Sequence, residues 1–189
     1  LMDLAHPSIV GVRDVGEWQG HLYMVMDLCP GETLGARLKR LQRIPAREAI
    51  AILLPVLDAL AYAHGKGVIH RDLKPANLML ARDEQNGSTQ VKVLDFGIAK
   101  VIDDQKGDEA GGGGLTAPGM AIGTLKYMSP EQAQGSAIDA RADLYSLAVV
   151  LFELVTGERP AGGEAAAGRH VGKVGRLALD GHQRLAAPL

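Results

Sequence analysis

The segment 70–77 carries residue types that could move a phosphoryl group. It reads His-Arg-Asp-Leu-Lys-Pro-Ala-Asn. Asp72, in a loop that Pro75 stiffens, could act as a general base and accept the proton of a hydroxyl group. Lys74 follows two residues later, where an extended backbone points both side chains to the same face. Its ammonium group could therefore contact the terminal phosphate of a nucleotide.

A second polar segment, Asp-Phe-Gly at 95–97, begins eighteen residues after Asn77. Asn77 and Asp95 supply hard oxygen ligands at the ends of neighbouring predicted strands. Such a pair suits Mg²⁺, which keeps several waters and takes further oxygens from phosphates. Gly97 would let the chain turn sharply after the metal ligand. Together, the two segments predict phosphoryl transfer, which depends on positioning and charge neutralisation.

The elements expected to position these residues follow from hydrophobic periodicity and turn residues. Segments 10–18 and 21–28 are expected to form an antiparallel pair that turns at Gln19-Gly20, with the second strand buried. Apolar residues at spacings of three and four predict a helix over 46–64, and a similar pattern predicts a helix over 142–156 that Gly157 ends. Short strands are expected at 68–70, 78–80 and 91–95. The apolar face expected for the first helix consists of Ile50, Leu53, Leu54, Leu57, Leu60 and Ala61.

Composition sets the broad class. The 189 residues are 47% hydrophobic and 22% charged, which is typical of a globular domain and argues against general disorder. The net charge of −2 gives no reason to expect a nucleic-acid partner. No apolar stretch is long enough for a membrane span of roughly 20 residues. Cys29 is the single cysteine, so no internal disulfide can form, and a reducing, cytoplasmic location is expected.

The two polar segments resemble those of the eukaryotic-type protein kinase superfamily, specifically its bacterial serine/threonine branch. Three further segments resemble the family in the same order along the chain. They are Leu-Ala-His-Pro-Ser-Ile-Val at 4–10, Met-Ser-Pro-Glu at 128–131 and Asp-Leu-Tyr-Ser at 143–146. The resemblance covers roughly residues 1–160.

The resemblance implies an α+β, protein-kinase-like fold, with a mostly helical C-lobe and only the last strands of the N-lobe. Residues 1–30 would be the remnant of the N-lobe: the end of the regulatory helix, two strands and the hinge. Residues 31–160 would be the C-lobe with its catalytic and activation loops. The tail, 161–189, is rich in Ala, Gly and Arg and stays unassigned, either as a divergent insert or as a sequence read out of frame.

The resemblance also implies the cofactors ATP and Mg²⁺ and a protein substrate. Lys74 in this position goes with serine and threonine as phosphate acceptors. For the nucleotide, Met26 would be the gatekeeper, Asp27 and Cys29 the hinge residues that hold the adenine edge, and Met79 the floor beneath the ring. Met24 is interpreted as strand core.

Regulatory and structural roles follow from the same resemblance. Arg71 would receive a phosphorylated activation loop, and Thr116 is the candidate for that modification. Thr124 would hydrogen-bond Asp72 and Lys74. The residues expected to be structural are His70 packing beside Phe96, Gly97, Glu131, and Asp143 in the helix that supports the catalytic loop.

Three parts of the family's ATP clamp have no counterpart in the sequence: the glycine-rich loop, the strand lysine and the helix glutamate. The family's order would place them upstream of residue 1, in a missing part of the N-lobe. We therefore expect weak or no ATP binding by the 189 residues alone. The alternative function is a catalytically incompetent, truncated kinase lobe that serves as a protein-interaction module. A more distant alternative, a metal hydrolase built on His64, His70, Asp72 and Asp95, is disfavoured by the histidine spacing.

Overall fold

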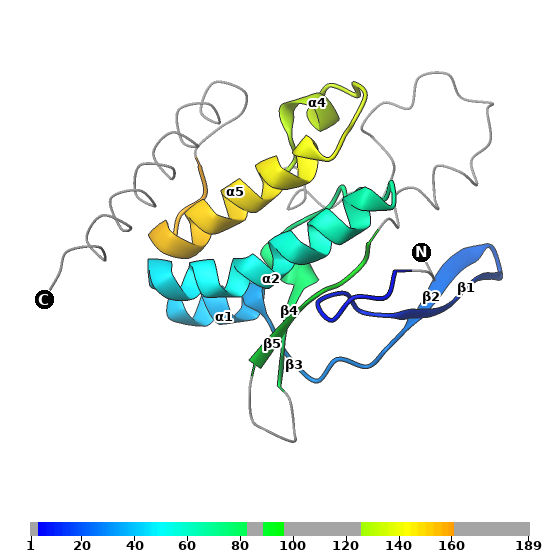
Figure 1. Cartoon of the computed structure of the whole chain (residues 1–189), viewed down its shortest axis with the longest axis horizontal. Coiled ribbons are helices and arrows are strands. Elements are labelled where there is room, and N and C mark those ends of the chain that lie inside the picture. Colours follow the sequence, from blue (N-terminus) through cyan, green and yellow to red (C-terminus); the bar gives the residue numbers. More distant parts are fainter. Residues whose placement is uncertain (1–3, 83–88, 97–125, 161–189) are drawn as a thin grey trace, which may run out of the picture.

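The computed structural model describes residues 4–82, 89–96 and 126–160. Within them, two sheets and three longer helices are arranged as Figure 1 shows. The strands are β1 (Val12–Trp18), β2 (His21–Met26), β3 (Gly31–Thr33), β4 (Leu78–Arg82) and β5 (Thr89–Val93). The helices are α1 (Leu34–Leu41), α2 (Ala46–Gly65), the 3₁₀ turn η1 (Pro75–Asn77), α4 (Pro130–Ala133) and α5 (Arg141–Thr156). None of the helices within the described ranges combines the length and apolar character that crossing a membrane requires.

The first two strands form the predicted antiparallel hairpin. Gln19 and Gly20, with φ of 51° and 75°, make its turn, and two positive φ values are what a tight hairpin turn requires. The expectation of a buried second strand is wrong, because Tyr23 and Val25 are more than 40% exposed. The physical reason is that β1 and β2 pair only with each other, and Figure 1 shows the hairpin projecting from the rest of the fold.

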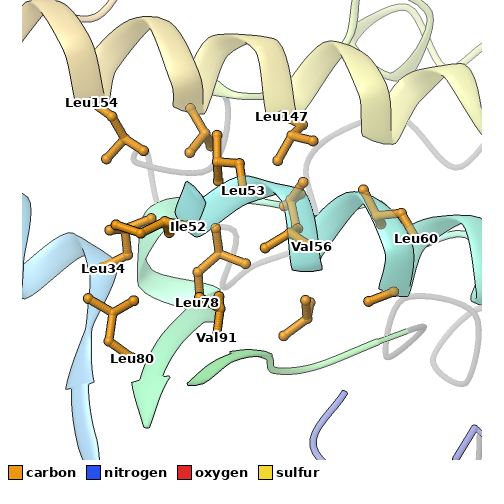
Figure 2. Packing of buried hydrophobic residues seen from close by; sticks show 14 of the residues in the cluster. Leu34, Ile52, Leu53, Val56, Leu60, Leu78, Leu80, Val91, Leu147 and Leu154 are labelled. Carbon is orange, nitrogen blue, oxygen red and sulfur yellow. The ribbon is translucent and has the colours of Figure 1, made fainter. Parts of the chain in front are cut away.

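The core lies on both sides of α2, which is sandwiched between α5 and the sheet β3–β4–β5 (Figure 2). From α5, Leu147 and Leu154 point towards α2, while Leu78 and Val91 approach from the sheet. All four side chains are at most 7% exposed. Burying an apolar side chain of this size contributes roughly 1.5–3 kcal/mol, so this three-layer stack is the main source of the fold's stability.

The predicted helix over 46–64 is confirmed as α2, but the face expected to be buried is partly wrong. Leu53 and Leu60 are buried as expected, whereas Ile50, Leu54 and Leu57 are 39–58% exposed. The face that is buried in the structure includes three alanines, whose small side chains let neighbouring elements pack close to α2. That face consists of Ala49, Ile52, Leu53, Val56, Ala59, Leu60 and Ala63. Because apolar residues surround most of the helix, their spacing alone did not identify the side that packs.

The predicted strands at 78–80 and 91–95 are confirmed, with shifted ends, as β4 and β5, which pair antiparallel. The strand expected at 68–70 is wrong. Its backbone amides bond elsewhere: Val68 N–H donates to the carbonyl of Ala63, and His70 N–H donates to the carboxylate of Asp143. No sheet partner is left for these amides, and the segment becomes an irregular loop.

Two further helices, α5 and α1, have ends that specific residues determine. The predicted helix over 142–156 is confirmed as α5, and it ends at Gly157, which adopts φ of 77°. A side chain there would meet the carbonyl oxygen of Gln42 at 2.5 Å, so only glycine fits. α1, which sequence patterns missed, is capped by the Thr33 hydroxyl. Gly35 brings α1 against η1, since a Cβ at this position would lie 3.3 Å from the backbone nitrogen of Ala76.

Candidate active site

A buried carboxylate at the start of α5 holds the loop that contains Asp72. Asp143 has a side chain that is 1% exposed, and it accepts three hydrogen bonds. The donors are the backbone N–H groups of His70 and Arg71, both at 2.9 Å, and Nε2 of His64 at 2.7 Å. A buried carboxylate needs such donors, because desolvation alone would make its charge very costly. Asp143 therefore fixes the backbone directly before Asp72.

Two residues of the site have strained backbones. Arg71 and Asp95 have φ of 69° and 60°, in the left-handed region that non-glycine residues rarely adopt. The Arg71 conformation is supported from both sides, since its N–H donates to Asp143 and its carbonyl accepts from Nε2 of Gln132 at 2.7 Å. Gln132 also closes a capping box with Ser129 at the start of α4.

Sequence reasoning missed Gln132 as a site residue. The spacing of Ser129 and Gln132 is a recognisable capping-box signal, but nothing local reveals that the amide nitrogen of Gln132 is bonded to a carbonyl sixty-one residues earlier in the chain.

Asp72 lies between Lys74 and Asn77. Its Oδ2 is 2.7 Å from Nζ of Lys74 and 3.2 Å from Nδ2 of Asn77, and the same Nδ2 donates to the backbone carbonyl of Asp72 at 2.8 Å. The Asp72 side chain is 38% exposed, whereas Asn77 is 6% exposed as a whole. The carboxylate is thus open to a reactant while its neighbours hold its orientation.

Asn77 and Asp95 are brought together through the backbone. The N–H of Leu94 donates to the carbonyl of Asn77 at 2.9 Å, and Nε2 of His70 lies 2.8 Å from the carbonyl of Leu94. The His70 ring also links the two segments, since its Nδ1 accepts from the backbone N–H of Asp72, while its Nε2 bonds the residue directly before Asp95. Nδ2 of Asn77 is used by Asp72, and its Oδ1 and the Asp95 carboxylate are oxygen donors of the kind that Mg²⁺ prefers.

His70 packs against Phe96, as the resemblance implies: the ring centroids lie 4.8 Å apart, edge to face. Nδ1 of His70 accepts from the backbone N–H of Asp72 at 3.2 Å, so Nε2 carries the proton that it donates to Leu94. Complete burial lowers the pKa of His70, and the nearby carboxylates, with Asp143 first, only partly oppose this. The imidazole is therefore neutral, and its role is to link the backbone of Asp72 to that of Leu94.

This arrangement predicts a loss of stability in acid. Above pH 6.5, His70 is neutral in both the folded and the unfolded state. As the pH falls below 6.5, the unfolded chain takes up a proton that the folded chain does not bind. We expect this residue to lower the free energy of unfolding by up to about 1.4 kcal/mol per pH unit, until the lower folded pKa is reached. His70→Gln should remove that part of the slope in urea titrations at pH 5–7.

The control for this measurement is His21→Gln, which removes an exposed imidazole from β2. A pH slope that is the same in His70→Gln and in the unsubstituted chain would show that His70 takes up its proton equally in both states.

The residues expected to bind the adenine lie at the end of β2, in the segment between β2 and β3, and in β4. Among the described residues, none hydrogen-bonds the backbone N–H of Cys29 or the backbone carbonyl of Asp27. The Asp27 side chain is held by Nε of Arg13 at 2.5 Å. Met26 is exposed at the end of β2, while Met79 is half-buried in β4 opposite Thr33. Burial raises the pKa of the Cys29 thiol, which fits a packing residue.

The structure describes only some of the remaining residues for which a role was expected. Arg71 is half-buried next to Asp72, and Glu131 lies in the first turn of α4, where no ion pair to it is formed by the described residues. Gly97, Thr116 and Thr124 lie outside the described residues, as does the tail 161–189. In the part of the chain that the structure describes, no three His, Cys, Asp or Glu side chains gather to hold a metal ion, which gives the metal-hydrolase alternative no support.

Comparison with known proteins matches residues 1–178 to the protein kinase domain family. The chain is 39% identical over 166 residues to a probable serine/threonine-protein kinase PknB of Lactococcus lactis, covering 88% of this chain and 24% of that protein. It is 44% identical over 161 residues to the serine/threonine-protein kinase PknB of Mycobacterium leprae, covering 83% and 24%. The chain thus spans about a quarter of the length of these curated relatives.

Solved structures are similar over most of the chain. The kinase domain of PknI from Mycobacterium tuberculosis superimposes with a TM-score of 0.65 at 30% sequence identity. The match covers 85% of this chain and 55% of the solved one. The fold, with its mixed helices and sheets and few N-lobe strands, is that of these domains.

Proposed function

Because the chain belongs to the protein kinase family, we propose that it is the catalytic part of a serine/threonine protein kinase, which transfers the γ-phosphate of ATP to hydroxyl groups of protein substrates. The observation that carries this proposal is the contact of Asp72 with both Lys74 and Asn77, whose carbonyl accepts from the residue directly before Asp95. The relatives named above as serine/threonine kinases support the choice of acceptor.

In the proposed reaction, Asp72 accepts the proton of a serine or threonine hydroxyl as the oxygen attacks the γ-phosphorus. The bond between the γ-phosphorus and the β–γ bridging oxygen breaks, and ADP leaves with the electron pair. Lys74, whose Nζ lies 2.7 Å from Oδ2 of Asp72, would contact a γ-phosphate oxygen.

Asn77 and Asp95 would hold Mg²⁺, which would neutralise the phosphate charge when bound. The hydrogen bond from the N–H of Leu94 to the carbonyl of Asn77 supports this role, because it holds the backbone before Asp95 against Asn77. The backbone carbonyl of Asp27 and the N–H of Cys29 would bind the adenine edge, between Met26 and Met79. These contacts require only the donors and acceptors that no other described residue uses.

The regulatory part of the proposal rests on family resemblance. Arg71 would pair with phosphorylated Thr116, Thr124 would bond the catalytic residues, and Glu131 would anchor the segment after the activation loop. We assign residues 1–30 to the N-lobe and 31–160 to the C-lobe, in a protein that works in a reducing, cytoplasmic environment.

One observation favours the alternative, a non-catalytic interaction module. An apolar hollow of about 210 Å³ lies between α2 and α5, and exposed Leu54, Leu57 and Leu144 contribute to it. Such a surface could take up a partner. The alternative makes no use of the Asp72 contacts, so a metal- and nucleotide-binding test separates the two.

We expect Mn²⁺, used as a paramagnetic substitute for Mg²⁺, to identify the metal ligands even if binding is weak. With ATP present, traces of Mn²⁺ added to the ¹⁵N-labelled chain should broaden the amide signals of Asp72, Asn77 and Phe96 before those of the β1–β2 hairpin. Asp95→Asn should abolish this selective broadening. The matched control is Asp139→Asn, at an exposed carboxylate that pairs with Arg141. Equal broadening in the Asp95 variant and the original chain would place the metal elsewhere.

A further inference from the structure

A cavity of about 590 Å³ lies next to the proposed catalytic residues. Its walls come from the side of α1 that carries Lys39, from the segment 74–76, and from the C-terminal end of α5. Tyr127, which precedes α4, and Arg159, which follows α5, complete the lining. Because Lys74 belongs both to this wall and to the Asp72 ion pair, the cavity borders the place where an acceptor hydroxyl must lie. An extended peptide advances roughly 3.3 Å per residue, so residues near the acceptor would reach it.

Among the described residues, the cavity wall contains one carboxylate, that of Glu153, and it already has two partners. Glu153 has a side chain that is 9% exposed, and it accepts the hydroxyl of Tyr127 at 2.5 Å and Nε of Arg159 at 2.9 Å. Burial and this bond raise the pKa of Tyr127, so the phenol stays a donor. A carboxylate held in this way offers little attraction to a basic residue of a substrate.

The cations of the wall are less constrained. Arg159 uses Nε on Glu153, but its side chain is 43% exposed, and a guanidinium carries four more N–H donors. Lys39 is exposed on α1, and no described residue pairs with its ammonium group. Lys74 also lines the cavity, but its charge is paired with Asp72, so among the described residues Lys39 and the remaining N–H donors of Arg159 are the groups that could take up a further carboxylate.

We propose that this cavity is a subsite for an acidic side chain, Asp or Glu, that lies within a few residues of the phosphorylated serine or threonine. Lys39 and Arg159 recognise the carboxylate, and the Glu153–Arg159 pair prevents the site from selecting a basic residue instead. The inference rests on the proposed kinase function and adds a substrate preference to it.

The test uses the natural protein that contains these 189 residues and a set of threonine peptides. Each peptide has one Glu, Gln or Lys, placed in turn at every position from four residues before to four residues after the threonine. At one or more positions, we expect kcat/KM for the Glu peptide to exceed that for the Lys peptide about tenfold, through a lower KM. The preference should shrink as salt is raised.

Two variants assign the preference to its residues. Lys39→Glu should abolish or reverse it, and Arg159→Gln, which leaves the Glu153 carboxylate without its cation, should shift it towards the Lys peptide. The matched control is Arg47→Glu, the same charge reversal at an exposed residue of α2 outside the cavity wall. It should leave the preference unchanged.

The possible failures are distinguishable. If the protein phosphorylates the peptides but ignores their charge at every position, or if Lys39→Glu keeps the Glu preference, the subsite is wrong and the kinase function stands. If no threonine peptide and no protein is phosphorylated at all, both proposals are overturned.

Discussion

Replacing Asp72 by asparagine should reduce phosphoryl transfer by a factor of about 10²–10⁴, the range that a positioned general base contributes. The amide is nearly the same size as the carboxylate, and its oxygen can still accept a bond from Lys74 or Asn77, the two partners seen here. What it loses is the ability to take the proton of the acceptor hydroxyl. In the natural protein that contains this chain, we therefore expect autophosphorylation to be lost while the fold and its unfolding midpoint are kept. The assay is incorporation of labelled phosphate from ATP.

The matched control is Asp58→Asn on α2, where the carboxylate is 79% exposed and forms a surface pair with His6. Such pairs contribute about 0–1 kcal/mol, so this variant should keep full activity. If Asp72→Asn transferred phosphate as fast as the control, another group would have to act as the base.

Replacing Asp143 by alanine should destabilise the fold by about 3–5 kcal/mol, the usual cost of removing one partner from a buried charged contact. Three donors would lose their acceptor at once: the backbone N–H groups of His70 and Arg71 and the ring of His64. Each buried donor left unpaired costs about 1–3 kcal/mol. Since domains are typically stable by only 5–15 kcal/mol, a large share of the stability would be lost. Urea unfolding measures it.

Asp58→Ala provides the comparison for this loss, since it deletes an exposed carboxylate of the same type. It should change the unfolding free energy by no more than about 0.5–1 kcal/mol. An Asp143→Ala variant as stable as Asp58→Ala would mean that water or a rearranged loop satisfies the three donors. The loop before Asp72 would then not depend on α5.

The parts of the fold that sequence patterns predicted are those with strong local signals. The turn at Gln19-Gly20 and the long periodic stretches of α2 and α5 belong to this class. The strand expected at 68–70 failed because its apolar residues resemble a strand locally, while their amides are bonded by α2 and by Asp143, seventy-three residues away from His70. α1 escaped notice because it is short and its first turn has no acidic residue.

For the candidate site, spacing in the sequence predicted Asp72, Lys74, Asn77 and Asp95; in the structure Asp72 contacts Lys74 and Asn77, and the residue before Asp95 bonds the carbonyl of Asn77. The contacts that stabilise the loop were less predictable. Gln132 reaches the carbonyl of Arg71 across sixty-one residues, and the neutralisation of Glu153 by Arg159 depends on how α5 ends. Pairings of this kind follow from tertiary packing, which leaves no periodic trace in the sequence.

The most direct test of the central claim is to identify the amino acids that receive phosphate. The natural protein containing these residues is incubated with Mg²⁺ and ATP labelled at the γ-phosphate, and its phosphorylated products are hydrolysed and separated. We predict label on phosphoserine or phosphothreonine, none on phosphotyrosine, and none when Mg²⁺ is removed by chelation. Label on tyrosine, or the absence of labelled protein at any Mg²⁺ concentration, would contradict the claim that Asp72, Lys74, Asn77 and Asp95 act together on one nucleotide.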